Sequence, residues 1–263
     1  PRTIRVTDVD RLKADPFAFY ARAMLDLKPL DPVDADQSAA WKGTAVHKVL
    51  EQWLIDGRCD PDDLVGRAKR LVESDAIHPM LRALWQPRLM EAIAWIAERQ
   101  RAHREEGRVP LAAEADGEAM IAGVLVQGRA DRIDRLAHGR LAIIDYKTGK
   151  PPAPRAIEEG FALQLGLLGL ILKAGGFAKA KGVPGAHEYW SLAMDRGSFG
   201  HCRAPDLKIG ADAFLASALR HFQGIAAAYL TGAEPFTAML HPAYALYGDF
   251  EQLARVEEWY GRE

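Results

Sequence analysis

Cysteine is scarce in this chain, with only Cys59 and Cys202 among 263 residues. Two thiols far apart in the sequence provide no disulfide framework, so free thiols in a reducing compartment are expected. The chain also lacks a continuous apolar run of membrane-spanning length, and its amino end lacks the basic and then apolar pattern of a secretory signal. We therefore expect a cytoplasmic protein without a membrane partner.

A strong excess of positive charge is also absent, because 34 Lys and Arg are balanced by 36 Asp and Glu to give a net charge of −2. This balance argues mildly against nucleic-acid binding, since domains of that kind often carry a basic excess. Local groups of cations remain at 99–104, 129–135 and 179–181. Each can be an ordinary solvated face, the simpler interpretation for 99–104, or part of a positive groove.

Two acidic strands are predicted beside each other near the middle of the chain. Residues 127–136 form the first, and the apolar run 141–144, typical of a strand buried on both faces, begins the second. A short turn at 138–139 joins them into a hairpin. In this arrangement Asp131 can face Asp145.

The end of the second strand carries the residues that indicate chemistry. Asp145 and Lys147 project to one face because alternate side chains of a strand do so, while Tyr146 projects to the other. Two carboxylates, from Asp131 and Asp145, offer only oxygen and suit a hard cation such as Mg²⁺ or Mn²⁺. The neighbouring lysine can orient water or offset charge that develops on a phosphate. The pattern predicts a magnesium-dependent nuclease site, although Asp-x-Lys alone is common by chance and is often a surface ion pair.

His47 is a candidate third metal ligand. It lies in a predicted helix over 40–55, beside a buried face marked by Val46 and Trp53. A lone histidine in such a place is more often a hydrogen-bonded core or surface residue than a ligand. The two acidic strands favour the ligand role.

Several separate segments carry a family resemblance. They are Thr7-Asp-Val-Asp-Arg-Leu-Lys-Ala-Asp-Pro-Phe-Ala-Phe-Tyr20, Gly43-Thr-Ala-Val-His47, Gly128-Arg-Ala-Asp131, Asp145-Tyr-Lys-Thr-Gly-Lys150, Gln164-Leu165 and Asp249-Phe-Glu-Gln-Leu-Ala-Arg-Val-Glu-Glu-Trp259. Together they cover nearly the whole chain. They resemble the RecB/AddB type of nuclease domain in the PD-(D/E)xK superfamily, most of all the carboxyl-terminal domain of alphaproteobacterial-type AddB.

The resemblance implies a metal site with a catalytic lysine. By this likeness His47, Asp131 and Asp145 would bind Mg²⁺ or Mn²⁺, and the Tyr146 carbonyl would complete the shell. Lys147 would be the catalytic lysine. The cofactor would therefore be a divalent metal ion.

Three further residues are candidates for the site, in addition to the metal ligands and the lysine. Gln164 would contact DNA or position the site, and Arg129, within a basic group, is a second candidate for DNA binding. Glu114 is a weaker candidate for the additional acidic residue of the family. Glu118 lies on the same stretch, and spacing does not decide between them.

The chain departs from the family pattern at two places. Members with an iron–sulfur cluster place one cysteine before the Pro-x-x-Phe-Tyr turn and three near the carboxyl end. Here Asp15 occupies the first place and only Cys59 and Cys202 exist, so no iron–sulfur cluster is expected. The usual Gln-x-x-x-Tyr also becomes Gln164-Leu-Gly-Leu-Leu168, which removes an aromatic group expected near the DNA.

The predicted fold class is α+β, with a PD-(D/E)xK, restriction-endonuclease-like core. A mixed central sheet would be flanked by helices, with an added amino-terminal helical region. We expect one nuclease domain, a fragment of a longer helicase–nuclease subunit. Residues 1–110 would form the helical region that carries His47, and 111–263 the sheet, the DNA-contacting helix and the carboxyl-terminal helices.

The remaining elements are predicted from periodicity and turn residues. Helices are expected over 7–25 with Thr7 as the N-cap, 61–73, 78–106, 157–174, 211–230 and 249–260. Two short strands are expected over 111–126 around a turn at Asp116-Gly117, and a strand pair over 187–193 and 198–203.

The expected function is that of a metal-dependent deoxyribonuclease, an exonuclease domain of an AddAB-type helicase–nuclease. It would hydrolyse one strand during resection of double-strand breaks and recombinational repair. Its partners would be a single DNA strand from an unwound duplex end and an AddA-type subunit. Two alternatives stay open, a catalytically silent nuclease fold used for DNA binding or scaffolding, and a stand-alone RecB-like exonuclease. The intact set of two aspartates, a lysine and a histidine argues against the silent form, because burying four polar side chains in one pocket costs free energy.

Overall fold

The computed structural model describes residues 2–28, 39–57, 59–73, 79–238, 240–245, 250–255 and 258. In chain order its elements are β1 (Thr3–Arg5), α1 (Val6–Ala14), α2 (Pro16–Phe19), the π-helical turn η1 (Tyr20–Met24), α3 (Ala39–Ile55), α4 (Pro61–Glu73), α5 (Pro79–Glu105), β2 (Val109–Ile121), β3 (Val124–Arg135), β4 (Leu141–Lys147), α6 (Pro154–Glu158), α7 (Gln164–Lys173), β5 (Pro184–Asp195), β6 (Ser198–Arg203), α8 (Ala211–Ile225), the π-helical turn η2 (Ala226–Leu230) and α9 (Glu251–Ala254).

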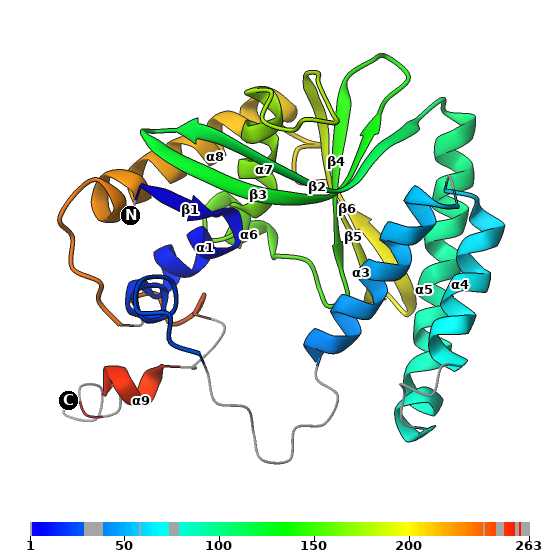
Figure 1. Cartoon of the computed structure of the whole chain (residues 1–263), viewed down its shortest axis with the longest axis horizontal. Helices are drawn as coiled ribbons and strands as arrows, with labels where there is room; N and C mark the ends of the chain where they lie inside the picture. The colour runs from blue at the N-terminus through cyan, green and yellow to red at the C-terminus, as the bar shows by residue number, and fades with distance from the viewer. Residues whose placement is uncertain are drawn as a thin grey trace.

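A six-stranded mixed sheet lies at the centre (Figure 1). The long strand β3 pairs antiparallel with β2 on one side. On its other side it pairs first with β1, in parallel, and then with β4, antiparallel. β5 continues the sheet parallel to β4, and β6 closes it antiparallel to β5. The predicted mixed sheet flanked by helices is confirmed.

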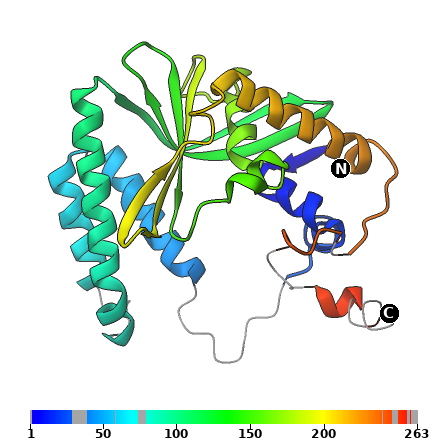
Figure 2. The same cartoon turned by 180° about the vertical axis from the view of Figure 1, so that it is seen from behind.

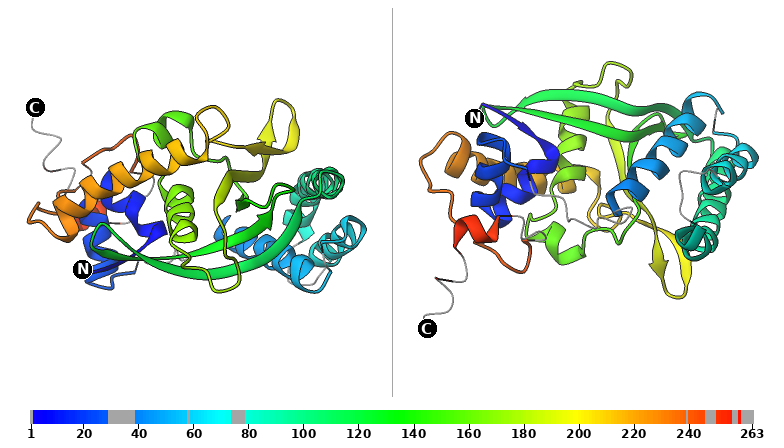
Figure 3. Two further views of the ribbon diagram at one scale, coloured as in Figure 1. Left: turned by 90° about the horizontal axis from the view of Figure 1, so that it is seen from above. Right: turned by 60° about the horizontal axis from the view of Figure 1, so that its bottom comes forward.

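Two hydrophobic clusters cover the sheet. The first joins α1, α7 and α8 to the sheet, and the second joins α3, α4 and α5 to it; Figures 2 and 3 show these two helical groups on different sides of the strands. Ile143 belongs to the first cluster, whereas Ile144 and Tyr146 belong to the second. The buried strand β4 therefore faces both clusters, as its apolar run predicts. Asp145 and Lys147 share the face of Ile143, toward α7.

The amino-terminal helix differs from the prediction. It begins at Val6, with Arg5 as an N-cap whose side chain makes no capping bond, so Thr7 is not the cap. The helix ends before Asp15, whose φ of −143° and ψ of 86° fit the restriction that a following proline imposes. Asp15 then caps α2 by accepting a hydrogen bond from the Ala18 amide. The region expected to be helical also contributes the short strand β1.

The prediction of two short strands around Asp116-Gly117 is wrong, because β2 runs unbroken through both residues. The turn comes later, at Ala122 and Gly123, whose φ values of 50° and 78° are those of a two-residue hairpin loop. A Cβ on Gly117 would lie 2.5 Å from the ring of Phe177. This glycine therefore permits close packing and does not mark a turn.

The helix expected over 157–174 is split into α6 and α7. Gly160, with a φ of 75°, lies in the break, where a side chain would meet the ring of His221. Gly175, with a φ of 74°, ends α7 as predicted.

The other predicted elements agree with the structure to within a few residues. They are the helices α3, α4, α5 and α8 with η2, the hairpin of β3 and β4, and the pair of β5 and β6. The helix expected over 249–260 is too long, because α9 covers only Glu251–Ala254 and Arg255, with a φ of 54°, ends it. Trp259 lies outside the described residues. No helix in the described part of the chain combines the length and apolar character needed to cross a bilayer.

Candidate metal centre

His47, Glu114 and Asp131 form a potential metal-binding group. One ligand atom from each lies within 4.8 Å of the others, and all three side chains are half-buried. The Nδ1 atom of His47 is 3.6 Å from Glu114 Oε1 and 3.6 Å from Asp131 Oδ1. An imidazole nitrogen with two carboxylates is a donor set that suits a divalent cation.

The register of β2 and β3 brings the two carboxylates together. Ala113 pairs with Arg132 and Ala115 with Ala130, so Glu114 stands opposite Asp131 on the same face. Glu114 has a φ of 44°, in the left-handed region that is unfavourable for a non-glycine residue by about 1–3 kcal/mol. Backbone strain of this kind gathers at functional sites.

A hydrogen bond orients the imidazole of His47. Its Nε2 atom lies 3.1 Å from the carbonyl oxygen of Tyr146. The neutral ring can donate from Nε2 to this carbonyl, which leaves the lone pair of Nδ1 directed at the two carboxylates. Metal-binding histidines are commonly fixed by such a bond through the other ring nitrogen. The role of the Tyr146 carbonyl as a direct ligand stays a prediction.

Asp145, Lys147 and Gln164 form a second, closed group. Lys147 Nζ lies 2.8 Å from Asp145 Oδ2 and donates to Gln164 Oε1 at 3.1 Å. The Gln164 side-chain amide donates to Asp145 Oδ1 at 2.9 Å. Gln164 is the first residue of α7, so the start of this helix fixes the acid and the lysine at the end of β4.

The two groups meet at the Tyr146 backbone. Its amide donates to Asp131 Oδ2 at 2.7 Å. Since Arg132 pairs with Ile144, the same register continued by one residue sets Asp131 opposite Asp145. The acidic residue within β3 and the one near the end of β4 therefore converge in the way the hairpin predicts.

Glu114 takes the place in the compact ligand group that was expected for Asp145. Asp145 is 2% exposed and lies in the group with Lys147 and Gln164. Glu118, the other candidate on this stretch, accepts a hydrogen bond from Gln127 at 2.8 Å. The metal roles of His47, Asp131 and Asp145 remain predictions.

Burial and neighbouring charge perturb the titration of these groups. Burial, and then the charge of Asp145, raise the pKa of Asp131 to about 7. Burial lowers the pKa of His47, but its bond to Glu114 and the charge of Asp131 outweigh burial and raise it overall. Burial also lowers the pKa of Lys147, and the charge of Asp145 outweighs this and raises it. The clustered carboxylates therefore hinder the ionisation of Asp131 and help His47 and Lys147 to keep their protons.

Asp10 is a residue of this region that the sequence analysis missed. Its Oδ1 accepts the Leu163 amide at 2.6 Å, just before α7 begins. Burial raises the pKa of Asp10 to about 7, although the charge of Lys147 lowers it. Its position on α1 between the buried residues Val9 and Leu12 was the available signal, because a carboxylate there needs a partner.

The arginines of the basic group at 129–135 do not lie on one common surface. Arg129 is exposed and makes two hydrogen bonds to Asp116, at 2.8 and 3.1 Å. Its role in DNA binding stays a prediction. Arg132 is fully buried and bonded to Asp134 at 2.7 Å, so it belongs neither to a solvated face nor to a groove lining, the two alternatives left open for this group.

Gln164 lines two cavities. One, of about 720 Å³, is lined by Asp131, Arg129 and Arg5 among others. The second, of about 600 Å³, is lined by Asp10 and Lys147 among others. A ligand can therefore reach Asp131 from the first cavity and Lys147 from the second.

The model of the PD-(D/E)XK nuclease superfamily matches residues 4–255. The chain belongs to this superfamily. The match includes every strand of the sheet except the first residue of β1, and both groups of site residues. Membership in the superfamily supports a nuclease role and dependence on a divalent metal.

Three relatives of this chain are proteins several times its length. An uncharacterized protein of Rickettsia conorii is 27% identical over 203 residues, which are 70% of this chain and 23% of the relative. One of Rickettsia felis is 28% identical over 197 residues, 67% of this chain and 22% of the relative. An ATP-dependent helicase/deoxyribonuclease subunit of Streptococcus mutans is 30% identical over 140 residues, 51% of this chain and 13% of the relative. The chain thus spans less than a quarter of each of them.

Among solved structures, the crystal structure of SSO0001 aligns with a TM-score of 0.33 and 12% sequence identity, over 84% of this chain and 75% of that one. This overlap is too low to establish a common fold, so the assignment depends on the family match.

Proposed function

We propose that this domain is a deoxyribonuclease that hydrolyses phosphodiester bonds of one DNA strand with a divalent metal ion, Mg²⁺ or Mn²⁺. The observation that carries the proposal is the convergence of two groups where the end of β4 lies beside β3. One group is His47 with Glu114 and Asp131, and the other is Asp145 with Lys147 and Gln164. One group offers metal ligands, and the other offers a fixed cation for a phosphate.

The first group of residues would hold the metal ion. His47, Glu114 and Asp131 would be its ligands, with Asp145 adjoining them. A bound ion supplies Lewis acidity and lowers the pKa of an attached water.

The second group acts on the water and the phosphate. Lys147 keeps its proton, so its ammonium can orient the attacking water and offset charge that develops on the phosphate. Gln164 accepts a hydrogen bond from the Lys147 ammonium and donates one to Asp145. These two bonds fix the lysine and the aspartate in one arrangement. Such preorganisation leaves little to rearrange when the phosphate arrives.

The broader role that we propose is exonucleolytic resection of double-strand breaks in the cytoplasm, within a longer AddB-like protein that works with an AddA-type helicase–nuclease. Recombinational repair would follow from that role. The support is the likeness to a protein named as part of a helicase/deoxyribonuclease, and the small share of each relative that the chain spans.

The test is cleavage of end-labelled linear single-stranded DNA with Mg²⁺, Mn²⁺ or EDTA. Lys147→Ala and Asp145→Ala should abolish cutting. Matched controls are Lys173→Ala and Asp195→Ala, the same changes at exposed positions on α7 and β5, which should cut like the parent. The ladder from each labelled end gives the polarity.

Calorimetry with Mn²⁺ separates the alternatives. Binding of metal without cutting would mean that a partner must deliver the strand. Neither binding nor cutting would favour the silent scaffold and overturn the nuclease proposal.

A further inference from the structure

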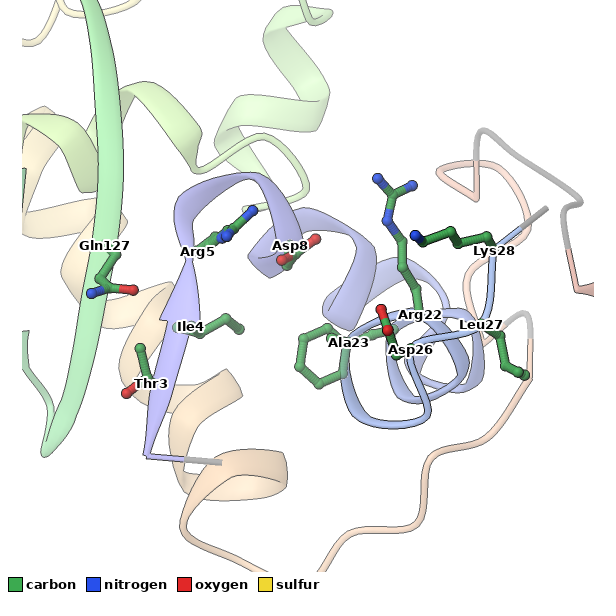
Figure 4. Close-up of a pocket in the computed structure, with 11 residues that line it drawn as sticks. Thr3, Ile4, Arg5, Asp8, Arg22, Ala23, Asp26, Leu27, Lys28 and Gln127 are labelled. Carbon is green, nitrogen blue, oxygen red and sulfur yellow. The ribbon is translucent and has the colours of Figure 1, made fainter. Parts of the chain in front are cut away.

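A third cavity, of about 560 Å³, lies between β1 and the turn η1 (Figure 4). Three positively charged residues line it, Arg5, Arg22 and Lys28, and all three are exposed. In Figure 4 the ends of Arg22 and Lys28 are turned to the same side of the cavity, and Arg5 lies on the β1 side. The cavity therefore presents positive charge from two chain segments.

The three cations are available for a ligand. Within the described residues, none of them takes part in an ion pair. Two carboxylates also line the cavity, from Asp8 and Asp26. Asp8 lies 3.7 Å from Arg11, so part of its charge is already balanced from outside the cavity. The lining thus has a surplus of positive charge.

This cavity adjoins the one that reaches the metal centre. Arg5 and Gln127 line both of them, and the second cavity extends to Asp131 and Gln164. Gln127 precedes Asp131 by four residues on β3, which corresponds to about 13 Å along the strand. A few nucleotides are enough to span that distance.

We propose that Arg5, Arg22 and Lys28 form a phosphate-binding subsite for the DNA strand whose scissile bond lies at Asp131. This inference rests on the proposed function and adds a binding track to it. The guanidinium groups match phosphate oxygens in a two-pronged geometry, and the ammonium binds them as a point charge. Contacts of this kind hold a backbone in position without reading its sequence.

The experiment measures binding without cleavage. Fluorescence anisotropy in EDTA would compare oligodeoxythymidine of about 4 and about 16 nucleotides, the range of site sizes for single-strand grooves. The test variant carries Arg5→Gln, Arg22→Gln and Lys28→Gln. The control variant carries three changes of the same charge at exposed positions on α4, α5 and the turn between β5 and β6, namely Lys69→Gln, Arg88→Gln and Arg196→Gln.

The test variant should bind the long strand at least about tenfold more weakly than the control variant, and the slope of log K against log salt should fall by about 2, since each phosphate contact on a single strand contributes about 0.7. The short strand also spans the roughly 13 Å from Asp131 to Gln127, so it too should bind the test variant more weakly than the control variant. Equal binding of the long strand by both variants would overturn the subsite.

Failure of the proposed function gives a different result. A parent that binds the long strand with the expected salt slope but never cuts it, with any metal, contradicts the nuclease proposal and leaves the subsite standing. A parent that cuts, while the test variant binds and cuts the long strand as well as the control does, contradicts the subsite alone.

Discussion

Replacing Asp131 by asparagine should stabilise the metal-free protein at high pH while removing its metal site. The Asp131 side chain is only 12% exposed, and burial with the charge of Asp145 raises its pKa from 3.8 to about 7. A raised carboxyl pKa means that the folded state binds more protons than the unfolded state between these two values. Stability is therefore lost as pH rises from about 4 to about 7.

The magnitude follows from the size of that pKa change. About three pH units separate the two values, and each corresponds to about 1.4 kcal/mol, so the ionised carboxylate destabilises the folded state by up to about 4 kcal/mol above pH 7. The asparagine side chain would keep an oxygen that accepts the Tyr146 amide, so this hydrogen bond is retained. We expect a gain of up to about 4 kcal/mol at pH 8, and a smaller gain at pH 5, where the carboxyl in the folded protein is largely protonated.

Urea unfolding in EDTA at pH 5 and pH 8 measures both gains for Asp131→Asn. Asp116→Asn is the matched control, because Asp116 is exposed and its bond to Arg129 lowers its pKa, so that change should bring no gain. Addition of Mn²⁺ should stabilise the parent and not the Asp131 variant. A loss of stability at pH 8, or the same gain at both pH values, would refute the reasoning.

Three further predictions concern other parts of the site and its support. Glu114→Gly should relieve the left-handed backbone and raise the melting temperature in EDTA, by about 1 kcal/mol of stability, while abolishing the shift that Mn²⁺ produces in the parent. Gln164→Ala should lower the cleavage rate by about 10–100-fold with nearly unchanged Mn²⁺ binding by calorimetry, because Gln164 bonds to Asp145 and the lysine beside it and lies outside the compact ligand group. Asp134→Ala should lower the free energy of unfolding by about 3–5 kcal/mol in urea, because Arg132 loses its buried partner; a smaller loss would mean that water reaches the arginine.

The sequence predicts the part of the site that depends on strand alternation and a short turn. The apolar run before Asp145 identifies β4, and the two-residue spacing places Lys147 on the same face. The turn through Gly139 is equally local, and it aligns Asp131 with the end of β4. These features need only neighbouring residues, so they can be read without a structure.

The rest of the site depends on contacts between distant segments. The choice of Glu114 over Glu118 depends on the register of β2, and that register follows from a turn at Ala122 and Gly123 that the more conspicuous Asp116-Gly117 pair obscured. Likewise, only the packing of α1 against α7 shows that Asp10 accepts the Leu163 amide. Sequence periodicity cannot supply either fact, since it carries no register between elements.

Position 168 shows why the departure from the family pattern is also structural. Leu168 is fully buried, and a Cβ on Gly128 would lie 2.8 Å from its side chain. The residue that replaces the expected tyrosine thus fills the core against the first acidic strand. Its direct effect is on the packing of β3, the strand that carries Asp131.

The other face of β3 explains how such a costly site is held in place. Arg132, next to Asp131, donates two hydrogen bonds to Asp134 and one to Gln100 on α5. Asp134 also accepts from Arg108, which is bonded in turn to Glu188 on β5. These buried partners are shared among β3, β5 and α5, so a shift of β3 would leave charges unpaired away from water. The buried ion pairs on one face of β3 therefore hold the strand in position. The opposite face, which carries Asp131, can keep its arrangement without a metal ion.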